Sequence, residues 1–480
     1  MKSGILRHRF RQLLFCFLLV GMVLFGGFTA IFAQEPSSLW IHSTVAEPVG
    51  LSMGTTRWQT IQGNLYAFTV VDGKIKVFTM QDQTLKEAGL LQSQDMEITA
   101  YQLEDVDGDR IPEVLAGTAD PGMLYLYKYQ NGRWESLDYG KYVWSSITKI
   151  IAGNFSGLTG MDILVQNKEG FLFLFHKSDQ ALDLIWKSPN PFRPFENALA
   201  YDLDNDTKDE IVVTYQKSGI AVLKLINQSI VTVWENYPWG KILALSAGDW
   251  DDDGRQEILF STSQKLVYLL SASSKGYFFK AQLANYNYII EQSALLKIAN
   301  QKYWVATDTA GKLHAIKLAK TIKQWQEVAC FTAGRANQLV NIDSEELFLW
   351  TVTQQALFYH FYDLTSFKLE FNGQLYDVKP GIICLGNQIY LSPRSLAIPG
   401  GGLEIAEQKN NIRFTHALNT LEINKLNPST ALLNGERIDH NTANNILSRN
   451  GEIYIPLQNY QNIFDMPVSI DFTSKTITLP

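Results

Sequence analysis

The sequence predicts an all-β fold built from repeated units, and two observations carry this prediction. Short β-rich runs alternate with glycine-containing turns from about Ser38 to Asp363, and no long helical periodicity interrupts them. An acidic nine-residue pattern also returns at nearly constant spacing inside that region. Self-similarity at a fixed period is typical of architectures that place one supersecondary unit beside the next.

The first 33 residues are expected to be a targeting segment and not part of the fold. A basic start, with Lys2, Arg7, Arg9 and Arg11, precedes an apolar run from Leu13 to Ala33. Such a start, an apolar core and a small residue at its end are typical of a secretory signal. Because the run is 21 residues long, an uncleaved membrane anchor is the alternative. In either case the rest of the chain is expected to be secreted or at the cell surface.

Removal of residues 1–33 leaves 447 residues, too many for one core, so two or more domains are expected. This part has 37 basic and 48 acidic residues, a net charge of −11. That charge argues against nucleic acid or anionic lipid as a partner and is compatible with cation binding. Its two cysteines, Cys330 and Cys384, do not make a disulfide framework. Two buried, unpaired thiols are predicted, and a disulfide between them is the alternative.

The acidic pattern occurs in three segments that align without gaps: Asp105–Glu113, Asp202–Glu210 and Asp249–Glu257. Each has carboxylates at positions one, three, five and nine and is followed by a short aliphatic run. A weaker copy, Asn154–Asp162, lacks carboxylates at positions three and five and is predicted to be a structural turn without metal. The four segments start 49, 48 and 47 residues apart. Propeller blades have a period of roughly 40–50 residues.

Three strand pairs without the acidic pattern extend the series, at residues 63–78, 303–316 and 346–359. Together with the four segments above they make seven units. The sequence therefore predicts a seven-bladed β-propeller over residues 38–365, with six or eight blades if one weak unit is miscounted. The strand Leu39–His42 is expected to close the ring against the last blade.

Calcium prefers six to eight oxygen ligands, and the acidic pattern supplies them from alternate positions of one loop. Four carboxylates this close together repel one another unless a cation is present. Three copies of this arrangement favour a metal over the alternative, a solvated acidic turn. The sequence predicts one structural Ca²⁺ in each loop, with these ligands: Asp105, Asp107, Asp109, the carbonyl of Ile111 and Glu113; Asp202, Asp204, Asp206, the carbonyl of Lys208 and Glu210; and Asp249, Asp251, Asp253, the carbonyl of Arg255 and Glu257.

On these residues the region resembles the FG-GAP and VCBS repeats of integrin-α-like propellers. Three of the seven units carry the full motif. The resemblance implies a propeller in which calcium braces hairpin loops and the ligand-binding surface lies elsewhere.

A second pattern begins after Asp363. Asn372-Gly373 and Asn434-Gly435 each precede a strand that ends at a proline, Pro393 or Pro456, and residues 468–479 are expected to form a hairpin. Residues 367–480 resemble the domain named for the N-terminal region of copper amine oxidases, which implies a small α+β or β-rich domain. Amine oxidase activity is not expected, because the seven histidines are scattered singly and no tyrosine has the setting of the quinone cofactor.

The sequence contains no nucleophile elbow, phosphate loop or zinc motif. The leading hypothesis is an exported, calcium-stabilised, non-catalytic binding or adhesion protein. Its ligand would be a glycan, a cell-wall component or a protein, and the C-terminal domain would add an attachment surface. The alternative is a polysaccharide lyase or hydrolase on a propeller scaffold, which requires carboxylates, histidine or arginine to converge at the central funnel.

Overall fold

The computed structural model describes most of the chain after residue 38. The predicted signal or membrane anchor at residues 1–33 lies outside the described residues. Within the described part, no helix is both long and apolar enough to cross a membrane. The described ranges are 39–45, 56–62, 64–81, 84–91, 96–130, 133–137, 140–178, 181–217, 219–238, 240–283, 288–298, 301–342, 346–351, 353, 355–377, 381–385, 388–398, 403–438, 445–449, 452–472 and 474–479.

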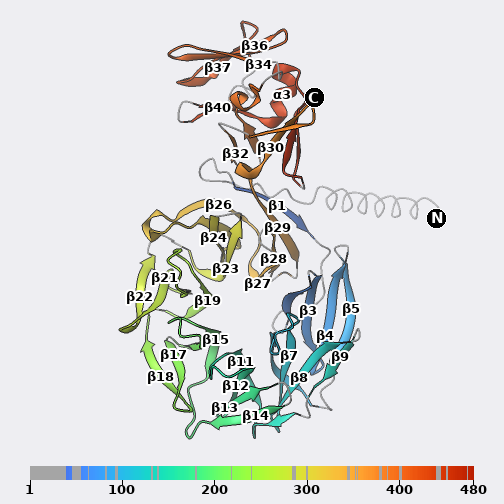
Figure 1. Ribbon diagram of the computed structural model, residues 1–480. Coiled ribbons are helices and arrows are strands. Elements are labelled where there is room, and N and C mark those ends of the chain that lie inside the picture. The colour runs from blue at the N-terminus through green and yellow to red at the C-terminus, as the bar shows by residue number, and fades with distance from the viewer. Residues whose placement is uncertain are drawn as a thin grey trace, which may run out of the picture. The chain divides into compact units, whose positions relative to one another are not determined.

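The protein is mostly β, as predicted, and it divides into two compact units. The larger unit contains Ala46–Val328 and Gly334–Tyr359, and the smaller contains Ala329–Ala333, His360–Pro480 and the chain up to Val45. Each of the seven predicted repeat units has one antiparallel sheet, and Figure 1 shows the sheets of the larger unit following one another in chain order from blue through green to yellow.

The first four sheets are formed as follows: β2 (Arg57–Ile61), β3 (Asn64–Val71), β4 (Lys74–Gln81) and β5 (Thr84–Leu91); β6 (Ile98–Glu104), β7 (Glu113–Thr118) and β8 (Met123–Gln130), with β9 (Arg133–Ser136) and β10 (Lys141–Tyr142) both pairing with β8; β11 (Ile147–Gly153), β12 (Met161–Asn167), β13 (Leu172–Lys177) and β14 (Leu182–Lys187); and β15 (Phe195–Tyr201), β16 (Glu210–Tyr215), β17 (Ile220–Ile226) and β18 (Ser229–Asn236).

The fifth to seventh sheets are formed by β19 (Ile242–Gly248), β20 (Glu257–Thr262), β21 (Val267–Ser273) and β22 (Gly276–Leu283); β23 (Ile290–Ile298), β24 (Gln301–Asp308), β25 (Lys312–Lys317) and β26 (Gln326–Thr332); and β27 (Ala336–Asn341), β28 (Glu346–Thr351) and β29 (Ala356–Asp363). The short 3₁₀ helix η1 (Ile322–Gln324) precedes β26. β1 (Leu39–Val45) lies beside β29, so Leu39–His42 pairs with the last unit as expected, and the closure of a ring by this strand stays a prediction.

Neighbouring sheets pack face to face through strands that are buried on both sides. In β7, Val114 packs toward the first sheet and Leu115 toward the third, as the two-residue period of a strand requires. Shared cores of this kind join the first five sheets in sequence and the fifth to the sixth. The seventh sheet returns to the first, where Trp58 packs on Phe348 with ring centroids 4.6 Å apart.

The smaller unit has three sheets around one apolar core. The sheets are β31-β30-β42-β41, β32-β33-β40-β39 and the meander β34 to β38. The elements are η2 (Leu364–Ser366), β30 (Lys368–Phe371), β31 (Gln374–Asp377), β32 (Ile382–Leu385), β33 (Gln388–Leu391), η3 (Pro393–Leu396), β34 (Leu403–Glu407), β35 (Asn411–His416), β36 (Asn419–Asn424), β37 (Asn427–Leu433), β38 (Glu436–Arg437), β39 (Leu447–Arg449), β40 (Glu452–Pro456), η4 (Leu457–Asn459), α3 (Tyr460–Phe464), β41 (Ser469–Asp471) and β42 (Thr476–Thr478).

Both predicted Asn-Gly turns of this unit are confirmed. At Asn372-Gly373 φ is 52° and 73°, and at Asn434-Gly435 it is 54° and 84°, the left-handed pair that a tight hairpin requires. The two proline-terminated strands of the internal repeat, β33 and β40, pair with each other, with Leu391 opposite Ile455. The predicted closing hairpin is formed by β41 and β42.

The two cysteines do not form a disulfide with each other. Cys384 is buried, and its Sγ lies 2.9 Å from the carbonyl oxygen of Leu39. Cys330 is half-buried, so the prediction of two buried thiols is wrong for Cys330.

Packing between the second and third sheets leaves no room for a side chain at Gly117. A Cβ atom there would lie 2.5 Å from Cγ2 of Ile147, so we expect Gly117→Ala to lower the free energy of unfolding by about 1–3 kcal/mol. The control is Gly89→Ala, whose Cβ would lie an ordinary 3.5 Å from Cδ1 of Trp134. Urea denaturation measures both variants, and equal stabilities would contradict this account of the sheet packing.

Candidate functional site

The three acidic segments form loops that join the first and second strands of their sheets. They connect β6 to β7, β15 to β16, and β19 to β20. Position nine of each segment is the first residue of the second strand, and these residues, Glu113, Glu210 and Glu257, are fully buried. Each loop therefore places its glutamate inside the sheet packing, and in the third loop Asp251 is buried as well.

Backbone N–H groups hold the loops in one common geometry. The glutamate at position nine accepts a hydrogen bond from the N–H of position two, at 2.9 Å from Val106, 2.8 Å from Leu203 and 3.1 Å from Trp250. The aspartate at position five accepts from the N–H of position seven in all three loops, at 2.8 to 2.9 Å. Ile111, Lys208 and Arg255, predicted to supply carbonyl ligands, thus take part through these N–H groups.

Three of the four predicted carboxylates in each loop converge, with one oxygen of each lying within 4.8 Å of the others. The converging sets are Asp105, Asp107 and Glu113; Asp202, Asp204 and Asp206; and Asp249, Asp251 and Glu257. The fourth carboxylate of each loop, Asp109, Glu210 or Asp253, forms an ion pair with a lysine.

Three lysines that were not predicted from the sequence complete these clusters: Lys128, Lys224 and Lys280. The Nζ of Lys224 lies 2.7 Å from Asp204, 3.0 Å from Asp206 and 2.6 Å from Glu210. Lys280 contacts the three corresponding carboxylates of its loop at 2.7 to 2.9 Å. Lys128 contacts Asp107, and lies 2.7 Å from Asp109 and 3.6 Å from Glu113.

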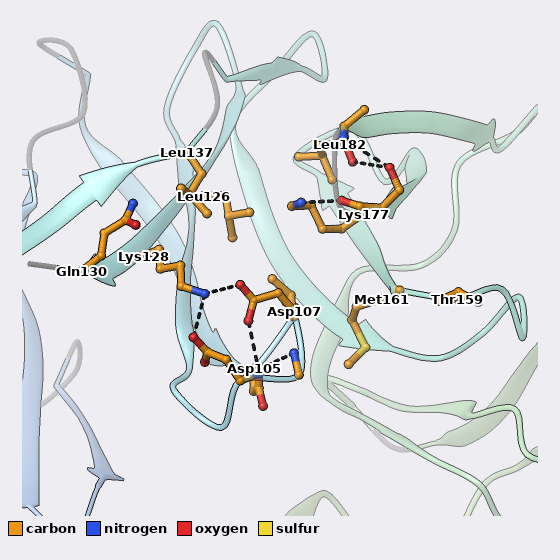
Figure 2. A pocket seen from close by; sticks show the side chains of 16 residues that line it. Asp105, Asp107, Leu126, Lys128, Gln130, Leu137, Thr159, Met161, Lys177 and Leu182 are labelled. Atoms are coloured by element: carbon orange, nitrogen blue, oxygen red, sulfur yellow. Dashed lines mark hydrogen bonds and ion pairs between the residues drawn. The ribbon is translucent and has the colours of Figure 1, made fainter.

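The first loop also lines a pocket of about 730 Å³. Figure 2 shows Lys128 reaching Asp107 at its wall, beside Asp105, with Leu126 and Leu137 above them. The loop therefore combines its charged groups with a surface that solvent reaches.

Cross-strand register explains two of the lysine positions. Because Val114 pairs with Tyr127, Lys128 stands opposite Glu113, and Lys224 stands opposite Glu210 in the same way. In the loop at Asn154 this position is occupied by His176, whose Nδ1 lies 2.7 Å from Asp162. A basic residue 22 or 23 positions after the start of the loop was the available sequence signal.

The charges of the loops shift one another's pKa values. Burial raises the pKa of Glu113 from 4.5 to about 7, and the nearby Asp107 and Asp109 also raise it. Burial likewise raises the pKa values of Glu210 and Glu257. Burial lowers the pKa of Lys224, but hydrogen bonds to its three carboxylates outweigh this effect, so the net shift is upward. Each ammonium is thus kept charged by its own loop.

The loops fit calcium only in part. Their converging carboxylates are the hard oxygen ligands that Ca²⁺ prefers. However, an ammonium group lies within ion-pair distance of the same carboxylates, and two cations cannot share that position. As arranged here, the residues do not fit Ca²⁺ unless the lysine moves away. Calcium binding stays a prediction from the sequence.

A second candidate site is a cavity of about 510 Å³ in the larger unit. It is lined by residues from the first strand of every one of the seven sheets, β2, β6, β11, β15, β19, β23 and β27. Side-chain amides from five of these strands contribute to its lining: Gln59, Gln102, Asn197, Gln292 and Gln338.

One part of this cavity is cationic. Arg57 and Lys149 both line it, and the pKa of Lys149 is lowered by burial and further by the positive charge of Arg57. The Nζ of Lys149 donates a hydrogen bond of 2.7 Å to the carbonyl of Glu196. Glu104 is the one carboxylate among the described lining residues, and burial raises its pKa.

Comparisons with known proteins identify no family for this chain. No family model and no curated protein matches the chain, so the FG-GAP, VCBS and copper amine oxidase resemblances rest on the residues alone. Solved structures with similar shape include a chain of the mitotic checkpoint complex (6% identity, TM-score 0.47, covering 68% of this chain and 92% of that one), BBS1N from its complex with ARL6DN (12%, 0.45, 68% and 97%) and Saccharomyces cerevisiae Sqt1 (12%, 0.46, 63% and 82%). All three TM-scores lie below 0.5, so no property of these proteins is assigned to this chain.

The raised pKa of Glu113 predicts a pH dependence of stability. Between about pH 4.5 and 7 the folded protein keeps a proton that the unfolded chain has lost, so the free energy of unfolding falls as the pH rises through this window. Glu113→Gln lacks this proton equilibrium. We therefore expect the free energy of unfolding of Glu113→Gln, minus that of the wild type, to increase by roughly 1–3 kcal/mol as the pH rises from 5 to 8.

Urea denaturation with a chelator present, at several pH values, measures this difference. The control is Glu87→Gln, which changes an exposed glutamate of β5. A difference between Glu113→Gln and the wild type that stays constant across the range would contradict the assignment.

Proposed function

We propose that this chain is an exported, non-catalytic binding protein whose larger unit is a seven-bladed β-propeller with a ligand site in its central cavity. The single observation that carries the proposal is the cavity lined by the first strand of all seven sheets. The return of the seventh sheet to the first, through Trp58 and Phe348, supports a ring of seven blades. The N-terminal pattern of residues 1–33 supports export.

The chemistry of the lining favours a carbohydrate that carries carboxylate groups. Side-chain amides both donate and accept hydrogen bonds, which suits a ligand rich in hydroxyl groups. Arg57 and Lys149 add two positive charges to the same cavity and would pair with an anionic group. Acidic glycans of the cell surface combine both properties.

The number of carboxylates in the described lining of the cavity favours binding over hydrolysis. A glycoside hydrolase uses two carboxyl groups that face each other across the scissile bond. Among the described residues of the lining, Glu104 alone carries a carboxylate, and it accepts a hydrogen bond of 3.3 Å from Gln102. A ligand held here would contact amides and cations.

A polysaccharide lyase is the second candidate, favoured by one observation. The pKa of Lys149 is shifted downward, the direction that a general base needs, and Arg57 could neutralise a uronate carboxylate beside it. Incubation with acidic polysaccharides tests this function by the ultraviolet absorbance of an unsaturated product. Product formation by the wild type that is lost in Lys149→Met would replace the binding proposal with catalysis.

For the smaller unit we propose an attachment role as a copper amine oxidase N-terminal-like domain. The pairing of β33 with β40 supports an internal repeat, because the matching strands of the two halves lie side by side. The exposed side chains of Leu418 and Leu426 lie on turns of its meander, where a partner can reach them.

The binding proposal predicts that Lys149→Met separates affinity from stability. We expect binding to a carboxylated glycan to weaken at least about tenfold, because an ion pair with the ligand is lost. The melting temperature should stay unchanged or rise, because a partly desolvated charge is removed. A glycan array followed by calorimetry at two salt concentrations measures affinity, and thermal unfolding measures stability.

The matched control is Lys312→Met, which changes an exposed lysine of β25 away from the cavity. It should bind as the wild type does. Failure of the wild type to bind any acidic glycan, or equal affinity of both variants, would refute this ligand class.

A further inference from the structure

We propose that the ammonium groups of Lys128, Lys224 and Lys280 hold the three acidic loops in place of calcium, and that calcium enters a loop only by displacing its lysine. These lysines belong to the loops of the larger unit, and their role is independent of the ligand proposed for the central cavity.

One set of lysine contacts occurs in all three loops. Each lysine reaches the carboxylates at positions three, five and nine of its own loop. An ammonium group has three N–H donors, which match three carboxylate acceptors. The lysine side chains are only 16 to 22% exposed, so they lie within the clusters and not in solvent.

The lysine ammonium reaches this position from two different strands of the sheet. Lys128 and Lys224 come from the third strand of their sheets, opposite the buried glutamate. In the third loop that register position belongs to Ser271, and the ammonium comes from Lys280 at the β-bulge of the fourth strand, β22. The same contacts reached from two strands indicate that the cation position itself is required.

The lysines also offset the negative charge of the loops. Each loop holds at least four carboxylates and has a fully buried glutamate, and a buried charge without a partner is strongly destabilising. The lysine supplies this partner from within the chain. Removing it recreates an acidic oxygen cluster of the kind that Ca²⁺ binds, so the two cations are alternatives for one position.

The three loops should respond to calcium unequally. In the third loop a second lysine, Lys302, lies 3.0 Å from both Asp249 and Asp252 and donates to the carbonyl of Asp249. This loop therefore carries two internal cations. The first loop has the longest lysine contact, 3.6 Å to Glu113, and lines an open pocket. Calcium should enter the first loop most readily and the third least.

The test compares the full chain with Lys128→Met and Lys224→Met, which keep most of the length of the side chain and remove its charge. Thermal unfolding is measured in EDTA and in saturating CaCl₂, and calcium binding by isothermal titration calorimetry. The wild type should melt at the same temperature in both buffers. Each variant should melt lower than the wild type in EDTA, regain most of the loss in CaCl₂, and bind calcium at least about tenfold more tightly than the wild type.

The matched control is Lys317→Met, at the end of the third strand of the sixth sheet, which has no acidic loop. It should behave as the wild type does. A wild type that melts lower in EDTA and binds three calcium ions tightly would overturn the proposal. Variants that match Lys317→Met in both measurements would overturn it as well.

A charge-balanced double variant keeps the test decisive if Lys224→Met does not fold. Asp204→Asn in the Lys224→Met background removes one carboxylate together with the lysine that neutralises it. We expect this variant to fold in EDTA and to melt above Lys224→Met. Absence of any recovery would show that lost packing, and not lost charge, explains the defect. Glycan binding is measured separately, so a failure here leaves the proposed ligand site untouched.

Discussion

The structure of the larger unit depends on face-to-face packing between sheets whose central strands are buried on both sides. Strands β7, β16 and β20 are buried over their whole length, so each sheet needs a neighbour on either face. A charged side chain in the middle of such a strand would lose its hydration without a partner. The acidic clusters of the three loops accordingly lie at the ends of these strands, where their carboxylates find partners.

The acidic loops lie at this boundary. Glu113, Glu210 and Glu257 are the first residues of the buried strands, and each accepts a backbone N–H of its own loop. That bond fixes the turn but brings a carboxylate into the packed region, where burial raises its pKa. A lysine ammonium lies beside each of these glutamates, from the adjacent strand in the first two loops and from the fourth strand of the sheet in the third.

The repeat spacing and the turn residues were sufficient to predict the β-rich character, the seven sheet-forming units and the Asn-Gly hairpins. They did not predict the lysines, for a physical reason. Lys128 meets Glu113 only through the register of β7 on β8, and register is decided by packing across the whole sheet. Lys280 depends on a local register shift in β22, which the sequence does not mark. The acidic pattern alone therefore predicted an external cation.

The lysines of the larger unit differ in what surrounds their charge. The carboxylates of the loops raise the pKa values of Lys128, Lys224 and Lys280, so each of these charges is already paired within its own loop. In Lys149 burial and Arg57 lower the pKa, and its ammonium donates to a backbone carbonyl. When burial destabilises the charged form of a lysine, a bound anion stabilises that charge. A lysine that is already paired with carboxylates gains little from an anion. This contrast separates the lysines proposed to hold the loops from Lys149, which is proposed to meet a ligand.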